Sequence, residues 1–230
     1  MSEPRTWIVT GGTGALGRAI VARALGDGAR AVVPWIVAEE RDELATAHAA
    51  AVADGSLVLL EADVAEPEGA RAVASAAGAP GVLVNGVGGF GGGEPIQDTP
   101  LELFDRMYRM NVRTAAAMAA AVAPAMIAQG RGAIVSIASQ AAFDAPAGLS
   151  AYAVSKAGIL VLTRSLQNEL GPHGVRVNAV VPTTIDTPAN RAAMPDADPS
   201  GWTPPARIAA VIAWLASDAG ATVRGGAIPV

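Results

Sequence analysis

Apolar runs that look like strands alternate with helix-like stretches along the whole chain. Most of these runs are continuously apolar, which is typical of strands covered on both faces. Repeated strand–helix–strand units predict right-handed crossovers and a parallel sheet. We expect an α/β fold, a single-domain doubly wound parallel sheet of about seven strands with helices on both faces. The expected strands are 7–10, 31–37, 57–60, 82–85, 133–138, 175–181 and 227–230, and the expected helices are 15–25, 40–53, 66–77, 101–129, 151–170 and 205–217.

The composition removes several classes of function. The 230 residues include no cysteine and only two histidines, which excludes a disulfide framework, a catalytic thiolate and a metal site of several imidazoles. A net charge of -5 argues against a nucleic-acid partner, because phosphate binding needs clustered basic residues. The alanine-rich run 115–128 is shorter than the about 20 residues that cross a bilayer, so we expect no membrane partner and a cytoplasmic location.

Two stretches interrupt the strand–helix rhythm. Residues 86–99 are dense in glycine, and residues 183–204 form a long segment rich in proline, aspartate and threonine. Connections of that length are usually functional. Both stretches follow expected strands, so both should lie at the carboxyl edge of the sheet, where doubly wound folds bind their ligands. We interpret 183–204 as a substrate loop within the one domain of residues 1–230.

A glycine-rich turn joins the first strand to the first helix. Glycine permits a positive φ and a close approach of the backbone, and the free N–H groups at a helix N-terminus attract a pyrophosphate. By itself the turn could be an ordinary strand–helix connection, but its position favours a phosphate site. The candidate phosphate-binding residues are Gly11, Thr13, Gly14, Ala15, Leu16 and Gly17.

Tyr152 and Lys156 lie four residues apart on an expected helix and should share a face. Lys156 is the only lysine beside fifteen arginines, and Tyr152 is one of two tyrosines. An ammonium about 4 Å from the phenol would lower its pKa by up to roughly three units. That shift would favour general acid–base catalysis near neutral pH.

These motifs, taken together, resemble those of the short-chain dehydrogenase/reductase family. The likeness runs through nearly the whole chain and includes Thr10-Gly11-Gly12-Thr13-Gly14-Ala15-Leu16-Gly17 and Tyr152-Ala153-Val154-Ser155-Lys156. Ala15 stands where the family has a glycine, a small-for-small change that should leave the turn intact. The resemblance implies a Rossmann-type fold that binds NAD(H) or NADP(H). It also implies a dimer or tetramer of identical chains, formed through the helices 101–129 and 151–170.

The resemblance implies a role for each member of a catalytic set. Ser139 would hydrogen-bond the substrate carbonyl oxygen, and Tyr152 would exchange the proton. Lys156 would hold the nicotinamide ribose. Asn111 would position a water that links Lys156 to solvent.

Other residues match the family's cofactor-binding positions less closely. Trp35 stands where an acid or a basic residue would choose between NAD and NADP, so that choice stays open; the neighbouring Glu39, Glu40 and Arg41 could contact the ribose or be solvated. Asp63 and Val64 resemble the pair that contacts adenine. The remaining positions implied to bind the cofactor or support its site are Asn85, Gly86, Pro182, Thr183, Ile185 and Thr187.

The long loop is similar to that of quinonoid dihydropteridine reductase, a divergent member of this family. The likeness lies in 186–191, 194–198 and 202–204, and in the glycine loop around Phe90. Phe90, Met194 and Trp202, together with Ser139, are our candidates for substrate contact. That enzyme lacks the serine at position 139 and has an acid at position 35, so the likeness supports a similar loop more than a shared substrate.

The residues therefore favour an oxidoreductase that transfers hydride between NAD(P)(H) and a small carbonyl compound or secondary alcohol. A pteridine reductase of the quinonoid type is the alternative. A non-catalytic nucleotide-binding protein is a third hypothesis, against which the intact Ser139, Tyr152 and Lys156 count.

Overall fold

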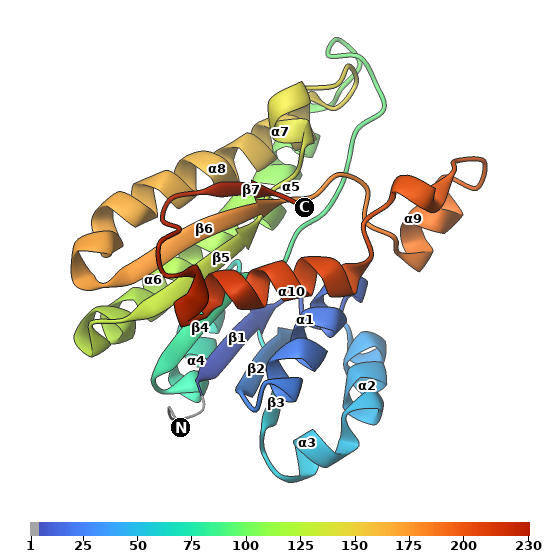
Figure 1. The fold of residues 1–230 in the computed structure, drawn as a ribbon. Helices are drawn as coiled ribbons and strands as arrows, with labels where there is room; N and C mark the ends of the chain where they lie inside the picture. The colour runs from blue at the N-terminus through green and yellow to red at the C-terminus, as the bar shows by residue number, and fades with distance from the viewer. Residues whose placement is uncertain (1–4) are drawn as a thin grey trace.

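One seven-stranded parallel sheet spans the chain from end to end in the computed structural model, which describes residues 5–230. The strand order is β3-β2-β1-β4-β5-β6-β7, and every neighbouring pair is parallel (Figure 1). The predicted fold class is confirmed. The strands are β1 (Thr6–Thr10), β2 (Arg30–Trp35), β3 (Leu57–Glu61), β4 (Pro80–Asn85), β5 (Gly132–Ile137), β6 (Val175–Val181) and β7 (Ala227–Pro229).

Helices cover both faces of the sheet (Figure 1). Side chains of α1 and α10 form one core cluster with the strands, and side chains of α4, α6 and α8 form a second cluster on the other face. Burial on both faces explains why the strands are continuously apolar. The helices are α1 (Ala15–Gly26), α2 (Ala38–Ala47), α3 (Ala49–Ala53), α4 (Pro67–Ala77), α5 (Leu101–Met107), α6 (Thr114–Gln129), α7 (Ala141–Asp144), α8 (Ser150–Leu170), α9 (Pro188–Ala193) and α10 (Pro205–Ala216).

Three elements differ from the sequence prediction. The expected helix 40–53 is two helices, because His48 has a non-helical backbone (φ -126°, ψ 37°) that ends α2 and begins α3. The expected strand 31–37 ends at Trp35, and α2 follows directly. The substrate loop 183–204, expected without regular structure, contains α9, which the side chain of Thr187 caps.

The stretch 101–129 is helical throughout but changes its winding. A π-helical turn, Tyr108–Arg113, joins α5 to α6. The whole stretch of 29 residues is long and apolar enough to cross a membrane by length and composition, whereas our prediction considered only the shorter run 115–128. Its α6 part packs on the sheet and on α4, where Met118, Val122 and Met126 are buried in the core. Core helices of globular proteins can have the same length and composition, so these two properties are only weak evidence for a membrane span.

The strand order reverses between β1 and β4, because β2 and β3 lie on one side of β1 and the later strands on the other. Doubly wound sheets bind ligands in the crevice outside the carboxyl ends of the strands at this point. The segments that follow β1 and β4 meet there. A Cβ placed on Gly11 would lie 2.6 Å from the carbonyl oxygen of Gly86. These two loops therefore form the floor of the candidate site.

Candidate active site

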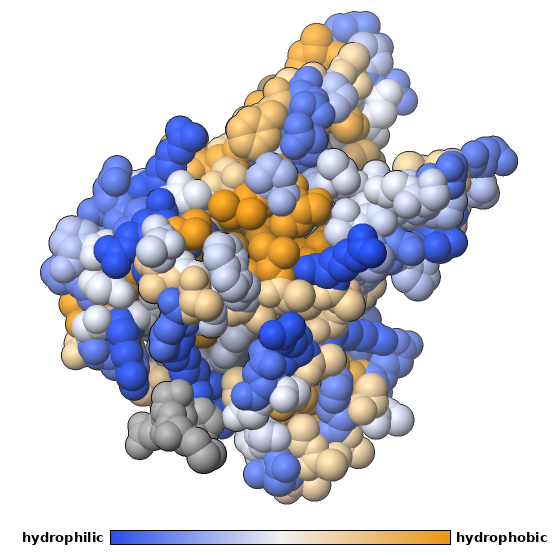
Figure 2. All heavy atoms as spheres, in the orientation of Figure 1, coloured by the Kyte–Doolittle hydropathy of each residue, from blue (hydrophilic) through white to orange (hydrophobic). Residues whose placement is uncertain are grey.

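The segments that should form the site project from the carboxyl edge of the sheet. Figure 1 shows α7 and the segment 86–99 rising together from this edge, with α9 standing apart from them. In the space-filling view the surface is hollowed between these two projections, and apolar residues line much of the hollow (Figure 2). The predicted site residues follow the ends of β1, β2, β3, β4, β5 and β6 or lie on the helical stretches 101–129 and 150–170.

The glycine-rich turn after β1 has the form that a phosphate site needs. Gly11 has φ +66°, a conformation that favours glycine. Gly17 packs so closely on Gly11 that a Cβ there would collide with the Gly11 carbonyl oxygen. The turn is closed by the Gly14 N–H, which donates to that same oxygen over 3.2 Å. Ala15 is exposed and begins α1, so the turn forms with alanine at this position.

The N-terminus of α1 is open to an anion. Gly14 precedes the helix and offers no side chain to cap it. The N–H groups of the first helical turn, including those of Ala15, Leu16 and Gly17, have no partner within the helix. With the helix dipole they form a ready anion site. These residues fit the pyrophosphate of a dinucleotide.

Next to the turn, α2 and the end of β2 form a polar corner. The Thr13 hydroxyl donates to Glu40 Oε2 over 2.7 Å, so this carboxylate is engaged by the turn itself. The Arg41 guanidinium lies over the Trp35 ring, 4.6 Å from the ring centroid. A cation stacked on an indole is a favourable contact. The residues that could contact an adenosine ribose are thus Trp35, Arg41 and the exposed Glu39, while Glu40 is engaged by Thr13.

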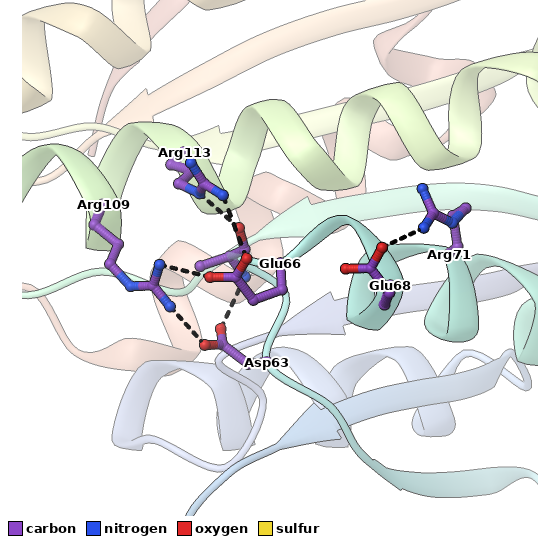
Figure 3. Close-up of polar contacts among 7 residues, drawn as sticks. Asp63, Glu66, Glu68, Arg71, Arg109 and Arg113 are labelled. Carbon is purple, nitrogen blue, oxygen red and sulfur yellow. Dashed lines mark hydrogen bonds and ion pairs between the residues drawn. The ribbon is translucent and has the colours of Figure 1, made fainter.

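The adenine-side pair after β3 is tied to the helical stretch 101–129 by ion pairs (Figure 3). Arg109 donates to Asp63 Oδ2 over 2.9 Å and to Glu66 Oε1 over 2.6 Å. Arg113 donates to the Ala65 carbonyl oxygen over 2.7 Å and pairs with Glu66 over 3.3 Å. The Arg109 guanidinium holds the pKa of the Glu66 carboxyl below its usual range. We call Asp63, Glu66, Arg109 and Arg113 the ion-pair clamp.

Val64 is buried at 4% exposure, and Asp63 also accepts a hydrogen bond from the Ala65 N–H over 2.9 Å. The loop after β3 is therefore fixed both by its own turn and by the ion-pair clamp. The prediction for Asp63 and Val64 as the adenine-contacting pair stays a prediction.

Asn111 lies in the π-helical turn, between the two arginines of the clamp, and is 1% exposed. Its Oδ1 accepts from the Gly89 N–H over 3.0 Å, and its Nδ2 donates to the Gly89 carbonyl oxygen over 3.2 Å. Nδ2 also donates to Ser155 Oγ over 2.9 Å, and Ser155 Oγ donates to the Tyr152 carbonyl oxygen over 2.7 Å. Asn111 thus joins the glycine loop 86–99 to the first turns of α8.

Lys156 is buried at 6% exposure, and its Nζ donates to the Ile137 carbonyl oxygen over 2.9 Å. A Cβ on Gly88 would lie 3.2 Å from Lys156 Nζ and 2.7 Å from Asn111 Oδ1, so these two polar groups face the same glycine. Burial lowers the pKa of Lys156 to about 8. The proposed water between Asn111 and Lys156 stays a prediction.

The electrostatic prediction for the phenol is wrong for this structure. Lys156 Nζ lies 5.9 Å from the centroid of the Tyr152 ring and is bonded to a backbone carbonyl. Burial raises the pKa of Tyr152, and a hydrogen bond with the Ser139 hydroxyl opposes that rise. Desolvation disfavours the phenolate and is the larger of the two effects, so the pKa of Tyr152 lies above its ordinary value rather than below it.

Ser139 lies two residues beyond β5 and is 9% exposed. Its Oγ accepts from the Ala141 N–H over 3.2 Å at the start of α7, and it interacts with the phenol of Tyr152. Phe90 packs edge-on against the Tyr152 ring, with centroids 5.1 Å apart, while its own ring is 67% exposed. The structure therefore brings Ser139, Lys156 and Phe90 together around the Tyr152 side chain.

Asn85, the last residue of β4, and Gly86, which follows it, connect the central strands. Asn85 Nδ2 donates to Ser136 Oγ of β5 over 3.1 Å, while its buried Oδ1 has no partner among the described residues. The Gly86 N–H donates to Thr10 Oγ1 over 3.1 Å, and a Cβ on Gly86 would lie 2.6 Å from the Thr10 carbonyl oxygen. The close approach of β1 and β4 explains the glycine where the family has a second asparagine.

The substrate loop is held by its own contacts. Ile185 and Thr203 pair as a parallel β-bridge, and Asn190 Nδ2 donates to the Ile185 carbonyl oxygen over 2.8 Å. Thr187 Oγ1 accepts from the Asn190 N–H over 3.1 Å, so this hydroxyl is engaged in capping α9. Arg191 and Asp186 form a further ion pair, 2.6 Å between Nε and Oδ1.

The remaining candidates of this region fall into two groups. Pro182 and Thr183 directly follow β6, and the Pro182 carbonyl oxygen accepts from the Gln140 N–H over 2.9 Å, which places them beside the segment of Ser139. Met194, 40% exposed, and the half-buried Trp202 lie in the loop that carries α9. Among the described residues, no hydrogen bond or aromatic stacking contact joins these two side chains to Tyr152 or Ser139.

Sequence reasoning missed the clamp arginines, the Trp35–Arg41 stack and the bridging hydroxyl of Ser155. Their partners are distant in sequence, as with Asn111 and Ser155, 44 positions apart. A single sequence carries no signal for such pairs.

Three comparisons with known proteins bear on this site. A family model described as short chain dehydrogenase matches residues 5–198. The 2-(R)-hydroxypropyl-CoM dehydrogenase of Xanthobacter autotrophicus is 40% identical over 190 residues, 80% of this chain and 76% of that protein.

Solved structures agree over nearly the whole chain. A blue fluorescent protein from a metagenomic library, in complex with NADPH, has a TM-score of 0.87 and 32% identity over 98% of this chain and 96% of its own. An NAD⁺-bound xylitol dehydrogenase has a TM-score of 0.86 and 25% identity over 98% and 97%.

Proposed function

The chain belongs to the short-chain dehydrogenase family, and we propose that Tyr152 is the general acid–base group of its reaction. Membership makes the protein an NAD(P)(H)-dependent oxidoreductase that acts on alcohols and carbonyl compounds as small-molecule substrates. The roles of individual residues, the cofactor preference and the assembly are the finer part of the proposal. The observation that carries it is that Ser139 and Lys156 both lie next to the Tyr152 side chain.

The bound dinucleotide supplies or accepts the hydride. In the direction of reduction, the Ser139 hydroxyl donates a hydrogen bond to the substrate carbonyl oxygen and holds it beside the phenol. Tyr152 then donates its proton to that oxygen as the alcohol forms. In oxidation the same phenol receives the proton. Its raised pKa keeps Tyr152 protonated, so it is ready as an acid before any further charge enters the site.

Lys156 prepares this proton transfer. Its buried Nζ stays bonded to the Ile137 carbonyl oxygen, which aims the amine at the space beside Gly88. There it can donate to ribose hydroxyls. With a pKa of about 8, Lys156 is near the point of releasing a proton at mildly alkaline pH. Asn111, through Gly89 and Ser155, fixes both the loop and the helix turn around this space.

Phe90 is proposed to contact the substrate, because its ring lies against Tyr152 and is 67% exposed. Met194 and Trp202 are proposed to approach the substrate from the loop that carries α9. The pteridine reductase alternative gains no support from the relatives described above, which are named as dehydrogenases or by their bound NADPH.

The test compares two tyrosines. Tyr152→Phe removes only the phenolic hydroxyl, and we expect kcat to fall by about 10²- to 10⁴-fold, the usual worth of acid–base catalysis. Tyr108→Phe is the matched control, because Tyr108 is the other tyrosine and is 57% exposed. Substrates come from a panel of small ketones, aldehydes and secondary alcohols with quinonoid dihydropterin included. Full turnover by Tyr152→Phe, with dinucleotide binding unchanged, would show that another group moves the proton.

We also propose a cytoplasmic enzyme assembled as a homodimer or homotetramer. The support is the exposed apolar surface of the two helical stretches, with Leu101 at 75%, Val154 at 62% and Val161 at 68% exposure. Apolar patches of this kind commonly mark contact with another protein.

A further inference from the structure

A second hollow lies at the amino edge of the sheet, at the opposite end of the strands from the active site. It has a volume of about 430 Å³, in the range of small-molecule sites. Its walls are the first residues of β1, β4, β5 and β6 and the turn after α10. In Figure 1 this edge lies beside the label of the N-terminus. No residue with a role in the proposed reaction reaches it.

Positive charge gathers in this hollow. Arg5, Arg131, Arg176 and Arg224 line it, and Asp218 is the only carboxylate among its described lining residues. The Asp218 side chain is 90% exposed and pairs with Arg5 over 2.6 Å, so solvent screens much of its charge. The local excess of three positive charges contrasts with a net charge of -5 for the chain.

Two of the four guanidinium groups are fixed by the backbone. Arg176, 8% exposed, donates to the carbonyl oxygens of Leu215, Gly220 and Ser217 over 2.5, 3.2 and 3.1 Å. Arg5 donates to the Ala216 carbonyl oxygen over 2.8 Å. These bonds hold both charges at the wall without removing them. Burial and the nearby Arg5 and Arg224 lower the pKa of Arg176, a sign that like charges are crowded here.

The other two guanidinium groups are available to a ligand. Arg131 is exposed, with no side-chain hydrogen bond or ion pair to residues 5–230, and Arg224 makes one long bond, 3.4 Å, to the Ala221 carbonyl oxygen. Near the start of β4, a Cβ on Gly81 would lie 3.3 Å from the Arg5 side chain, so the glycine leaves room for Arg5 at the wall. Guanidinium forks bind phosphate oxygens in pairs, and several of them around one cavity favour a multiply charged anion.

We propose that this amino-edge hollow binds a small polyanion of the oligophosphate class. Arg131 and Arg224 close on the anion, and Arg5 and Arg176 provide the fixed positive wall. The site is separate from the dinucleotide cradle and does not depend on the proposed catalytic roles.

The test uses inorganic tripolyphosphate as the probe, with binding measured by titration calorimetry on the full chain. The dinucleotide cradle is kept filled with saturating NADH or NADPH, whichever binds, because it too attracts phosphates. We expect the double variant Arg131→Gln/Arg224→Gln to weaken tripolyphosphate binding by at least about tenfold, the loss of two charged contacts. The variant should keep its turnover, since neither arginine lies near Tyr152.

The matched control is Arg71→Gln/Arg164→Gln, which removes two exposed arginines from α4 and α8 and should leave the affinity unchanged. Equal weakening in both double variants would mean a general charge effect and would overturn the proposal. Loss of tripolyphosphate binding when the dinucleotide is added would place the anion in the cradle, with the same consequence. Citrate binding as tightly as tripolyphosphate would overturn the oligophosphate assignment.

Discussion

At the scale of single residues, burial shifts the pKa values of Lys156 and Tyr152 in opposite directions. Burial disfavours the ammonium of one and the phenolate of the other, so the pKa of Lys156 falls and that of Tyr152 rises. The two pKa values therefore move apart, so that in mildly alkaline solution Lys156 is close to losing its proton while the Tyr152 phenol keeps its own. This environment, rather than a direct charge on the phenol, is what the structure provides before a ligand binds.

The lowered pKa of Lys156 predicts a pH dependence of stability. The folded chain releases this proton near pH 8 and the unfolded chain near 10.5, so between these values the unfolded state binds more protons. The free energy of unfolding should therefore rise with pH through this window, relative to Lys156→Met, by about 2–3 kcal/mol between pH 8 and 10. Urea unfolding at a series of pH values measures it. If the free energy of unfolding changed with pH in the same way for the wild-type protein and for Lys156→Met, the lowered pKa of Lys156 would be contradicted.

The corner formed by Trp35 and Arg41 predicts a cofactor preference. The end of β2 carries no carboxylate, Glu40 is engaged by Thr13, and a guanidinium lies over the indole. We expect this corner to accept a 2′-phosphate better than a 2′-hydroxyl, and so to favour NADP(H). Arg41→Gln should raise the KM for NADP(H) by about tenfold, the worth of one charge-assisted contact, and change that for NAD(H) little. If Arg41→Gln raised the KM for NAD(H) more than the KM for NADP(H), the corner would instead favour NAD(H).

The proposed catalytic residues could be picked out from the sequence because they lie close together in it or follow the end of a strand. Tyr152 and Lys156 share one helix face, and Ser139 follows β5 at the edge where all the strands end. The pKa of Tyr152 was not predictable, because it depends on how deeply α8 buries the ring and on the Ile137 carbonyl oxygen that engages Lys156. Neither burial nor a backbone partner can be deduced from spacing.

At the scale of elements, the helical stretch 101–129 works as a joint between the two ends of the candidate site. Its π-helical turn places Asn111 against Gly89 and Ser155, while Arg109 and Arg113 on either side reach the loop after β3. Such turns widen a helix locally and are frequent at functional sites. The loop after β3 and the first turns of α8 are thereby connected through the six residues of the π-helical turn, Tyr108–Arg113.

The ion-pair clamp gives a test of this connection. Arg109→Gln/Arg113→Gln releases the π-helical turn from Asp63 and Glu66. We expect kcat to fall by about tenfold, less than the roughly hundredfold that a 1 Å misplacement costs, with a higher KM for the dinucleotide. Arg71→Gln is the control, because it removes an exposed ion pair with Glu68 on the same helix α4 (Figure 3). Equal kinetics of the clamp variant and this control would show that the clamp has no positioning role.

The elements that sequence analysis found are those with long, uniform apolar patterns. The bounds of β6 were predicted to the residue, and those of α8 to within one. α9 escaped because six residues give no periodicity and its start depends on Thr187 bonding the Asn190 N–H. The break at His48 was not predicted either, because the alanines on both sides of it favour an unbroken helix.

At the scale of the whole molecule, the apolar side chains left on the outside of α5 and α8 call for a partner. Val161 is 68% exposed on α8, and Tyr108 is 57% exposed beside α5. We expect Val161→Glu to lower the molar mass in solution, measured by size-exclusion chromatography with light scattering. Val52→Glu on α3, where the valine is 40% exposed, should leave the mass unchanged. A monomeric wild-type protein would refute the proposed assembly.

The two hollows occupy opposite ends of the same strands. At the carboxyl edge the helix N-termini and glycine loops face the dinucleotide, and at the amino edge arginines gather where helices end. This separation follows from parallel topology, which puts every strand start on one side and every strand end on the other. A ligand at one end therefore need not compete with a ligand at the other.

The solitary lysine gives the molecule an internal reporter. An acylating reagent meets one side-chain amine in the entire sequence, and that amine is 6% exposed beneath the loop 86–99. In the native protein it should react slowly, at the pace at which the loop lifts away. The rate at which the adduct appears on Lys156, followed by mass spectrometry of the peptide that carries it, would thus measure how often the loop opens over this side chain, without any engineered label.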